Sequence, residues 1–314
     1  MAQGKSRRDV MIGTLGLTLS GCATGAGGEA PVAAPALERR TVAAPGGGSI
    51  EADYGKLMVP AVRRDAASGT FELNFVRLLN TAGAGRAPIV FLAGGPGDSS
   101  SWMAGNEFGM NQIAPLLAAG DVILLDQRGT GGSRPLGSWR WDTAPNLNFF
   151  VSEAIATTHF REGSRRAIAA LTAQGVRLDG FTTEEAADDV NDLRRALGLE
   201  KVSIWGFSYG THLGLSVLRR HGPHIERAIL IGVEGPDDTY KPPLGMDRAF
   251  DRIARLAAAD PNVAGAGDLW ELRDRVRARL ARGDVAVEVE GGGQRYTLPV
   301  GPFGLDLILR FDIG

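Results

Sequence analysis

Four short apolar runs separated by long polar segments constrain the fold of this chain more than any other feature. The runs are residues 89–93, 122–125, 202–205 and 228–231. Their length and their β-branched residues are typical of strands that are buried on both faces. Residues 184–197 are amphipathic, follow a capping box of Thr182 and Glu185, and end at Gly198, which predicts a helix. Strands that alternate with helices predict a parallel α/β sheet, with its chemistry at the carboxyl ends of the strands.

The N-terminal third has two further patterns. Residues 56–59 and 70–79 alternate apolar and polar side chains around a turn at 66–69, which predicts a β-hairpin. Upstream, residues 22–53 are dominated by Ala, Gly and Pro, a composition that buries little and stays extended. We therefore expect a tether over 22–53 and a folded core that begins at Tyr54.

The first 21 residues have the pattern of an export signal. Lys5, Arg7 and Arg8 precede an apolar run at 10–19, which is too short to span a bilayer as a mature helix. The four residues that end in Cys22 read Leu-Ser-Gly-Cys and resemble a bacterial lipobox, in which the cysteine is lipidated. A generic signal peptide with an unrelated cysteine is the alternative. We expect a protein of the bacterial cell envelope, periplasmic or held at the membrane through Cys22.

Composition excludes several classes of function. The chain is 44% hydrophobic and 22% charged, as in soluble globular proteins. Its formal net charge is −2 and it has no block of Lys and Arg, which argues against a nucleic-acid partner. One cysteine cannot form an intrachain disulfide or a cysteine-based metal site.

The most specific motif follows the run at 202–205 and precedes a helical stretch at 211–220. It reads Gly206-Phe207-Ser208-Tyr209-Gly210, the G-x-S-x-G pattern of a nucleophile elbow. A sharp bend between strand and helix would expose the Ser208 hydroxyl at a helix N-terminus, where developing negative charge is favoured. The alternative is a turn serine that only caps the helix.

A glycine-rich loop follows the run at 89–93. It reads Gly94-Gly95-Pro96-Gly97 and lies where a serine hydrolase needs a backbone donor for an oxyanion. We expect the N–H groups of Gly95 and Tyr209 to form this oxyanion hole. On its own the loop would be interpreted as a plain Gly-Pro turn.

A third motif, Asp126-Gln127-Arg128-Gly129-Thr130-Gly131-Gly132-Ser133, follows the run at 122–125. It has neither the Gly-Lys-Ser/Thr ending nor the G-x-G-x-x-G spacing of a nucleotide site. We interpret Arg128 as a structural anchor for neighbouring loops rather than a substrate ligand.

Together, Gly94 to Gly97, Asp126 to Gly129 with Ser133, and Gly206 to Thr211 resemble the proline iminopeptidase and tripeptidyl-aminopeptidase-like branch of the α/β-hydrolases. The resemblance runs from Tyr54 to Pro243. It implies a serine peptidase that removes N-terminal residues or short peptides through an acyl-enzyme on Ser208, with no metal and no organic cofactor. Many proline iminopeptidases have His where this chain has Ala93, so the resemblance favours the tripeptidyl-like branch.

The resemblance also implies a general base, and the four histidines are poorly placed for it. His159 lies before the serine, and His212 lies one helical turn after it on a helix that leads away. His221 and His224 flank the Gly-Pro pair that ends this helix, so we expect them at the far end of the sheet. Each is interpreted as a packing or surface residue.

Acidic residues follow the run at 228–231. Some α/β-hydrolases keep the triad acid at such a position, but we interpret Glu234 and the pair Asp237-Asp238 as loop residues or contacts to a substrate amine. Glu234 is therefore a weak candidate for substrate binding.

The resemblance implies an α/β-hydrolase fold, a mostly parallel sheet with helices on both faces. The core would occupy 54–234 and the start of a helical cap 235–314, with apolar helical stripes at 246–256 and 269–280 and a hairpin about Gly291 to Gly293. The C-terminal strands that bring the triad acid and histidine would be missing. We expect these 314 residues alone to be nearly inactive and to expose an unpaired sheet edge.

Two other functions remain open from the sequence. An esterase or lipase could use the same elbow on acyl esters, and a surface lipoprotein could bind peptides without catalysis. The expected partners are a peptide substrate and, through Cys22, a membrane.

Overall fold

The computed structural model describes residues 32–80, 85–133, 146–237 and 243–313. The predicted signal peptide, the lipidation site Cys22 and Asp238 lie outside these residues. The elements described below all lie within residues 33–314.

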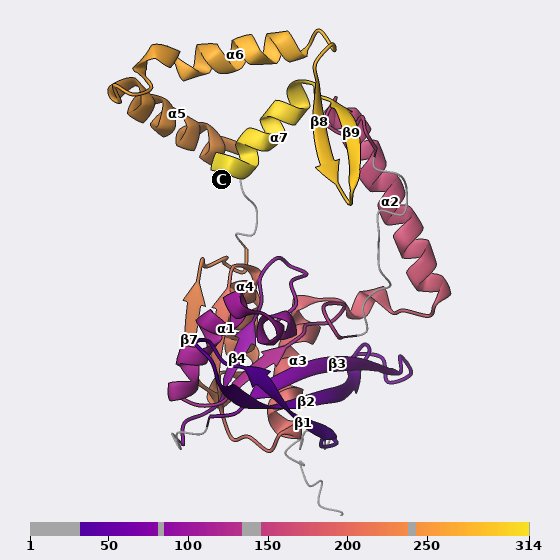
Figure 1. Ribbon diagram of the computed structural model, residues 1–314. Helices are drawn as coiled ribbons and strands as arrows, with labels where there is room; N and C mark the ends of the chain where they lie inside the picture. Colours follow the sequence, from indigo (N-terminus) through magenta and orange to yellow (C-terminus); the bar gives the residue numbers. More distant parts are fainter. Residues whose placement is uncertain (1–31, 81–84, 134–145, 238–242, 314) are drawn as a thin grey trace, which may run out of the picture. The chain divides into compact units, whose positions relative to one another are not determined.

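Residues 37–231 contain a seven-stranded mixed sheet (Figure 1), in the order β1-β2-β3-β5-β4-β6-β7. Its strands are β1 (Leu37–Ala43), β2 (Ser49–Pro60), β3 (Thr70–Leu78), β4 (Ile89–Leu92), β5 (Val122–Leu125), β6 (Val202–Phe207) and β7 (Ile225–Ile231). The pairs β5·β4, β4·β6 and β6·β7 are parallel, which confirms the four strands predicted from the apolar runs. The predicted hairpin is the antiparallel pair β2·β3.

The sheet begins earlier in the chain than the sequence indicated. Strand β1 lies inside the predicted tether and pairs antiparallel with β2 from Leu37 opposite Gly55 to Ala43 opposite Ser49. All its side chains except Val42 are exposed, so the apolar pattern that marks buried strands is absent. The strand is held by backbone pairing and by Arg39, which donates to Asp53 at 2.5 Å.

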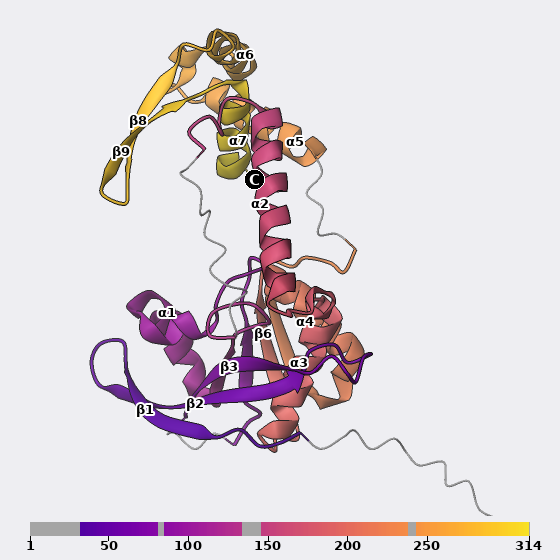
Figure 2. The same cartoon turned by 90° about the vertical axis from the view of Figure 1, so that its right-hand side faces the viewer.

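Helices cover both faces of the sheet, as expected (Figure 2). On one face, α1 (Glu107–Ile113), with the 3-10 turns η1 (Ser101–Gly105) and η2 (Ala114–Ala118), packs Met110 and Ile113 into a cluster with Phe91 and Leu124. On the other face lie α3 (Thr183–Ala196) and α4 (Tyr209–His221). A side chain at Gly214 of α4 would touch Leu92, Ile204 and Leu230, so this helix packs closely on three parallel strands.

The remaining elements are mostly helical. They are α2 (Glu153–Ala173), η3 (Leu178–Gly180), η4 (Gly222–His224), α5 (Pro243–Ala259), η5 (Ala264–Ala266), α6 (Leu269–Leu280), β8 (Ala286–Gly291), β9 (Gln294–Pro299) and α7 (Pro302–Ile313). The pair β8·β9 is the hairpin predicted about Gly291 to Gly293. Helix α2 was not predicted; its N-cap is Ser152, which accepts from the Ile155 N–H. Of the helices that can be described, none has the length and hydropathy needed to cross a bilayer.

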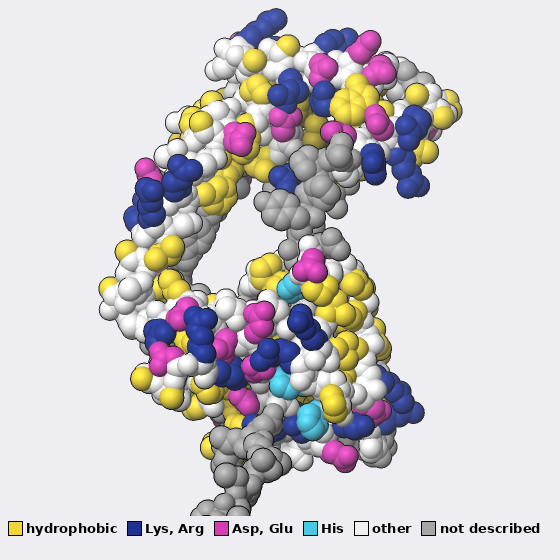
Figure 3. All heavy atoms as spheres, turned by 180° about the vertical axis from the view of Figure 1, so that it is seen from behind, with side chains coloured by type: hydrophobic (Ala, Val, Ile, Leu, Met, Phe, Trp, Pro, Cys, Tyr) yellow, Lys and Arg dark blue, Asp and Glu magenta, His cyan; other side chains and the backbone are white. Residues whose placement is uncertain are grey.

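Strand β7 differs from its prediction as a fully buried strand. Ile229 and Ile231 are 58% and 46% exposed, although both belong to its apolar run. The reason is position, because β7 is the last strand in the sheet order and α4 covers only the face that carries Leu230. Hydrophobic side chains gather over this edge of the sheet (Figure 3), beside a groove of about 330 Å³ that Trp205 also lines.

Candidate active site

Ser208 lies at a sharp bend between β6 and α4. Its backbone has φ +52° and ψ −123°, and it is the one non-glycine residue with positive φ in the described part of the chain. Such a conformation costs on the order of 1–3 kcal/mol and persists only where the surroundings impose it. Here the Ser208 N–H donates to the Ile231 carbonyl at 2.9 Å, which ties the bend to the end of β7. This is the geometry that the elbow motif predicts.

The glycines of the motif are required by close backbone approaches. A side chain at Gly206 would meet the Gly210 carbonyl at 2.5 Å, and one at Gly210 would collide with the Leu92 carbonyl. A side chain at Gly94 would lie 3.2 Å from the Ser208 Cβ. The glycine loop after β4 therefore lies directly beside the bend, at the carboxyl ends of β4 and β6.

The two expected oxyanion donors belong to these neighbouring segments. Gly95 is exposed and has φ +106°, a conformation that favours glycine. Tyr209 is the first residue of α4, where backbone N–H groups have no acceptor within the helix. The Tyr209 ring stacks on His212, and its hydroxyl lies 3.2 Å from the Thr183 Oγ1.

A fully buried carboxylate, Asp126, holds Ser99 and Ser101, which follow the glycine loop. It accepts from the Ser101 N–H and the Ser99 hydroxyl at 2.9 Å each, and from the Ser101 hydroxyl at 2.6 Å. The Gly132 N–H and the Asn74 amide complete its shell at 2.8 and 3.0 Å. The sequence analysis included Asp126 in the motif Asp126 to Gly129 but assigned it no role of its own.

Arg128 is a structural anchor, as predicted. It forms two hydrogen bonds to Asp189, at 2.6 and 2.8 Å. It also donates to the backbone carbonyls of Pro60, Ala61 and Gly180. All five N–H donors of the Arg128 guanidinium are therefore used in hydrogen bonds within the protein.

Glu234 lies next to the nucleophile. The Ser208 hydroxyl donates to the Glu234 Oε1 over 3.3 Å. The backbone between them is tied by Thr211, whose Oγ1 donates to the Ser208 carbonyl at 2.7 Å and accepts from the Glu234 N–H at 2.8 Å. Thr211 is fully buried, and no sequence pattern indicated this role.

The histidines lie as expected. His212 Nδ1 is 3.2 Å from the Gly235 carbonyl, and His221 Nε2 is 2.8 Å from Asp188 Oδ1. His221 and His224 precede β7 whereas Glu234 follows it, so both lie at the opposite end of that strand from the bend. His159, on α2, has its ring 6.0 Å from that of Phe149. We therefore assign none of the four as the base.

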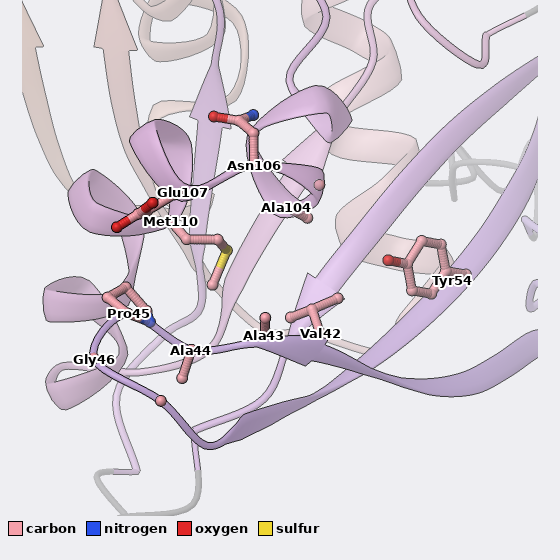
Figure 4. A pocket seen from close by; sticks show the side chains of 12 residues that line it. Val42, Ala43, Ala44, Pro45, Gly46, Tyr54, Ala104, Asn106, Glu107 and Met110 are labelled. Carbon is pink, nitrogen blue, oxygen red and sulfur yellow. The ribbon is translucent and has the colours of Figure 1, made fainter.

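The described residues contain no group of three His, Cys, Asp or Glu side chains that could hold a metal ion. They do contain a pocket that is separate from Ser208. A pocket of about 530 Å³ lies between the β1–β2 turn and α1 (Figure 4), where Pro45, Gly46, Asn106 and Met110 line it. Neither Ser208 nor Glu234 contributes to its lining.

A serine at a strand-to-helix bend of a central parallel sheet, facing a glycine loop, defines an α/β hydrolase. The protein-family model described as alpha/beta hydrolase fold matches residues 87–273 of the sequence. The chain therefore belongs to this family. Among curated proteins it is 28% identical over 245 residues to a tripeptidyl aminopeptidase of Streptomyces lividans. It is 26% identical over 270 residues to the serine protease Hip1 of Mycobacterium tuberculosis. Among solved structures, a proline iminopeptidase-related protein of Thermus thermophilus matches 56% of this chain and 44% of its own, with 22% identity and a TM-score of 0.33.

The chain spans half or less of the length of the curated relatives it matches. The alignments cover 76% and 79% of this chain, but 41% of the tripeptidyl aminopeptidase and 50% of Hip1. The relatives are thus distant serine peptidases that contain much additional polypeptide.

Proposed function

We propose that this chain carries the nucleophile and the oxyanion loop of a serine aminopeptidase, which releases N-terminal residues or short peptides through an acyl-enzyme on Ser208. The observation that carries the proposal is the strained backbone of Ser208, held directly beside the loop of Gly94 and Gly95. Strain of this kind is concentrated at functional sites. The names of the curated relatives support peptides as substrates.

The proposed reaction has two steps. The Ser208 Oγ forms a bond to the substrate carbonyl carbon while its proton passes to a general base. The N–H groups of Gly95 and Tyr209 donate to the resulting oxyanion, the C–N bond breaks, and the base returns the proton to the leaving amine. Water then hydrolyses the acyl-enzyme by the same route and frees Ser208.

The general base is the part of the machinery that we do not assign to this chain. His212 and His221 make other contacts, and His224 lies at the other end of β7. We propose that a residue outside the described part of this chain supplies the base; the curated relatives extend well beyond the aligned length. Without it, we expect hydrolysis of aminoacyl-naphthylamides by these residues alone to be nearly undetectable.

Labelling with a fluorophosphonate probe tests the nucleophile. The protein is incubated with the probe with and without added imidazole, which can act as an external base, and the adduct is located by mass spectrometry. We expect an adduct on Ser208, faster labelling with imidazole, and none at this position in Ser208→Ala. An adduct confined to other serines, or no adduct under either condition, would overturn the proposal.

Comparing aminoacyl-naphthylamides with p-nitrophenyl esters under the same imidazole conditions separates a peptidase from an esterase. A Ser208-dependent rate on esters alone would favour the esterase.

The envelope location remains part of the proposal. Its test is a diacylglyceryl mass on Cys22 in protein from a bacterial membrane fraction.

A further inference from the structure

The carboxylate of Glu234 has an unusual position for a group beside a nucleophile. Its Oε1 lies 3.3 Å from the Ser208 Oγ, and its backbone is fixed by the Thr211 hydroxyl. The side chain is half-buried. Among the described residues, no Lys, Arg or His forms a direct ion pair with this carboxylate.

A carboxylate with no paired cation among the described residues opposes the reaction that Ser208 is proposed to perform. Attack on a carbonyl group develops negative charge within a few ångströms of the serine oxygen, and like charges in a partly buried site repel. A substrate that brings its own positive charge to Glu234 removes this repulsion. A substrate without such a charge leaves both the repulsion and a partly desolvated carboxylate.

Peptide geometry specifies which cation reaches this place. In an amino acid, the α-nitrogen lies about 2.5 Å from its own carbonyl carbon, and a serine oxygen attacks from about 3 Å. The α-ammonium of a first residue under attack therefore lies roughly 3–5 Å from the Ser208 Oγ, within hydrogen-bond reach of Glu234. The ammonium of a tripeptide cleaved after its third residue lies about 7 Å further away.

We propose that Glu234 binds the α-ammonium of the residue whose carbonyl Ser208 attacks, so that the site releases one N-terminal residue at a time. This inference rests on the proposed function and narrows it. It selects peptides with a free N-terminus over blocked peptides, and single-residue release over the tripeptide release named for the Streptomyces relative. On binding, the carboxylate exchanges the Ser208 hydroxyl for the ammonium, which leaves the hydroxyl available to the base.

Binding measurements test this inference without requiring turnover. Dissociation constants of alaninamide and N-acetylalaninamide are measured by NMR titration for the native chain, for Glu234→Gln and for Glu107→Gln. Glu107 is an exposed acid at the start of α1 with no role at this site, so its variant controls for general negative charge. We expect alaninamide to bind at least tenfold more tightly than its acetylated form in the native chain and in Glu107→Gln, and equally in Glu234→Gln.

A third ligand tests the register. In 8-aminooctanamide the same number of bonds separates the ammonium from the amide carbon as in a tripeptide, so we expect it to gain nothing from Glu234. No preference for the free amine in the native chain overturns the inference, as does a preference that survives Glu234→Gln or an equal gain for the long ligand. Circular dichroism of Glu234→Gln confirms that the variant is folded.

The two proposals fail in different ways. If Ser208 is labelled by the fluorophosphonate but Glu234 confers no preference for a free amine, the one-residue register is wrong and the serine hydrolase stands. If Glu234 confers the preference but Ser208 is never labelled, the ammonium site is supported and the proposed reaction is wrong.

Discussion

At the scale of single residues, the bend at Ser208 is a place where backbone strain coincides with the proposed nucleophile. The φ of +52° is disfavoured for serine because its Cβ approaches the backbone, whereas glycine lacks that atom. The surrounding hydrogen bond to Ile231 and the packed α4 hold the residue in place.

Replacing Ser208 with two small residues measures the strain. Both Ser208→Ala and Ser208→Gly remove the hydroxyl, but only glycine relieves the positive φ. We expect Ser208→Gly to be more stable than Ser208→Ala by about 1 kcal/mol in urea unfolding. Equal stability of the two variants would show that the bend is unstrained.

Thr211 connects Ser208 to Glu234 through one buried hydroxyl. In Thr211→Val, the Glu234 N–H loses its acceptor and the Ser208 carbonyl keeps only the Thr211 N–H, while the side-chain volume is retained. We expect a loss of about 1–3 kcal/mol in the free energy of unfolding, because unpaired buried polar groups are costly. The exposed Thr70, at the start of β3, provides the matched control, and Thr70→Val should change stability by less than about 0.5 kcal/mol.

At the scale of elements, Asp126 joins the loops that follow β4 and β5. Five hydrogen bonds converge on one fully buried carboxylate, from Asn74, Ser99, Ser101 and Gly132. The segment that follows the glycine loop, Ser99 to Ser101, is thus held from the end of β5 as well as from β4.

Removing this carboxylate should therefore loosen the loop. We expect Asp126→Ala to lower the free energy of unfolding by about 3 kcal/mol, since several buried donors lose their acceptor together. Asp98 lies in the same loop but is exposed, and Asp98→Ala should have little effect. Urea unfolding compares the two, and similar losses would show that Asp126 is not the anchor.

Helices α3 and α4 are joined by a charged contact between Asp188 and the pair Arg220 and His221, and this contact depends on pH. Burial raises the pKa of Asp188, but hydrogen bonds from His221 and Arg220 outweigh it and bring the pKa to about 2, below the ordinary 3.8. A lowered folded-state pKa gives stability that is present above the unfolded pKa and is lost as the pH falls through the folded one.

The stabilisation by Asp188 should therefore disappear between about pH 4 and pH 2. We expect Asp188→Asn to be less stable than the native chain at pH 6 by on the order of 1 kcal/mol, allowing for partial exposure. The difference should shrink toward zero near pH 2. Asp247→Asn, an exposed acid on α5, serves as control, and a difference for Asp188→Asn that is independent of pH would contradict the assignment.

At the scale of the whole molecule, the sequence predicted those parts whose signal is local. The parallel strands β4 to β7 could be predicted because strands that prefer burial have continuous apolar sequences. The elbow could be predicted because its tight bend requires glycine at fixed positions. Strand β1 was missed because its side chains are exposed. The roles of Asp126 and Thr211 depend on contacts with residues distant in the sequence, which no local pattern records.

The error at β7 shows what an apolar run does and does not predict. The apolar run indicates that a strand prefers burial, but burial requires a neighbouring element. In the described residues β7 is an edge strand, and one of its faces is exposed. Ile204, on the adjacent β6, has the same side chain and is fully buried. Ile204 and Ile229 therefore show that the same apolar side chain is buried or exposed according to its position in the sheet.

Truncating each isoleucine measures that difference. We expect Ile204→Ala to cost about 2–5 kcal/mol in the free energy of unfolding, because it leaves a cavity between β6 and α4. Ile229→Ala should cost less than about 1 kcal/mol, since little buried area is lost from a side chain that is 58% exposed.

An exposed apolar edge also promotes association, so Ile229→Lys should reduce concentration-dependent self-association in sedimentation velocity experiments. A large loss of stability in Ile229→Ala would mean that this face is covered in solution, and a second copy seated on β7 would then be revealed by the same sedimentation data.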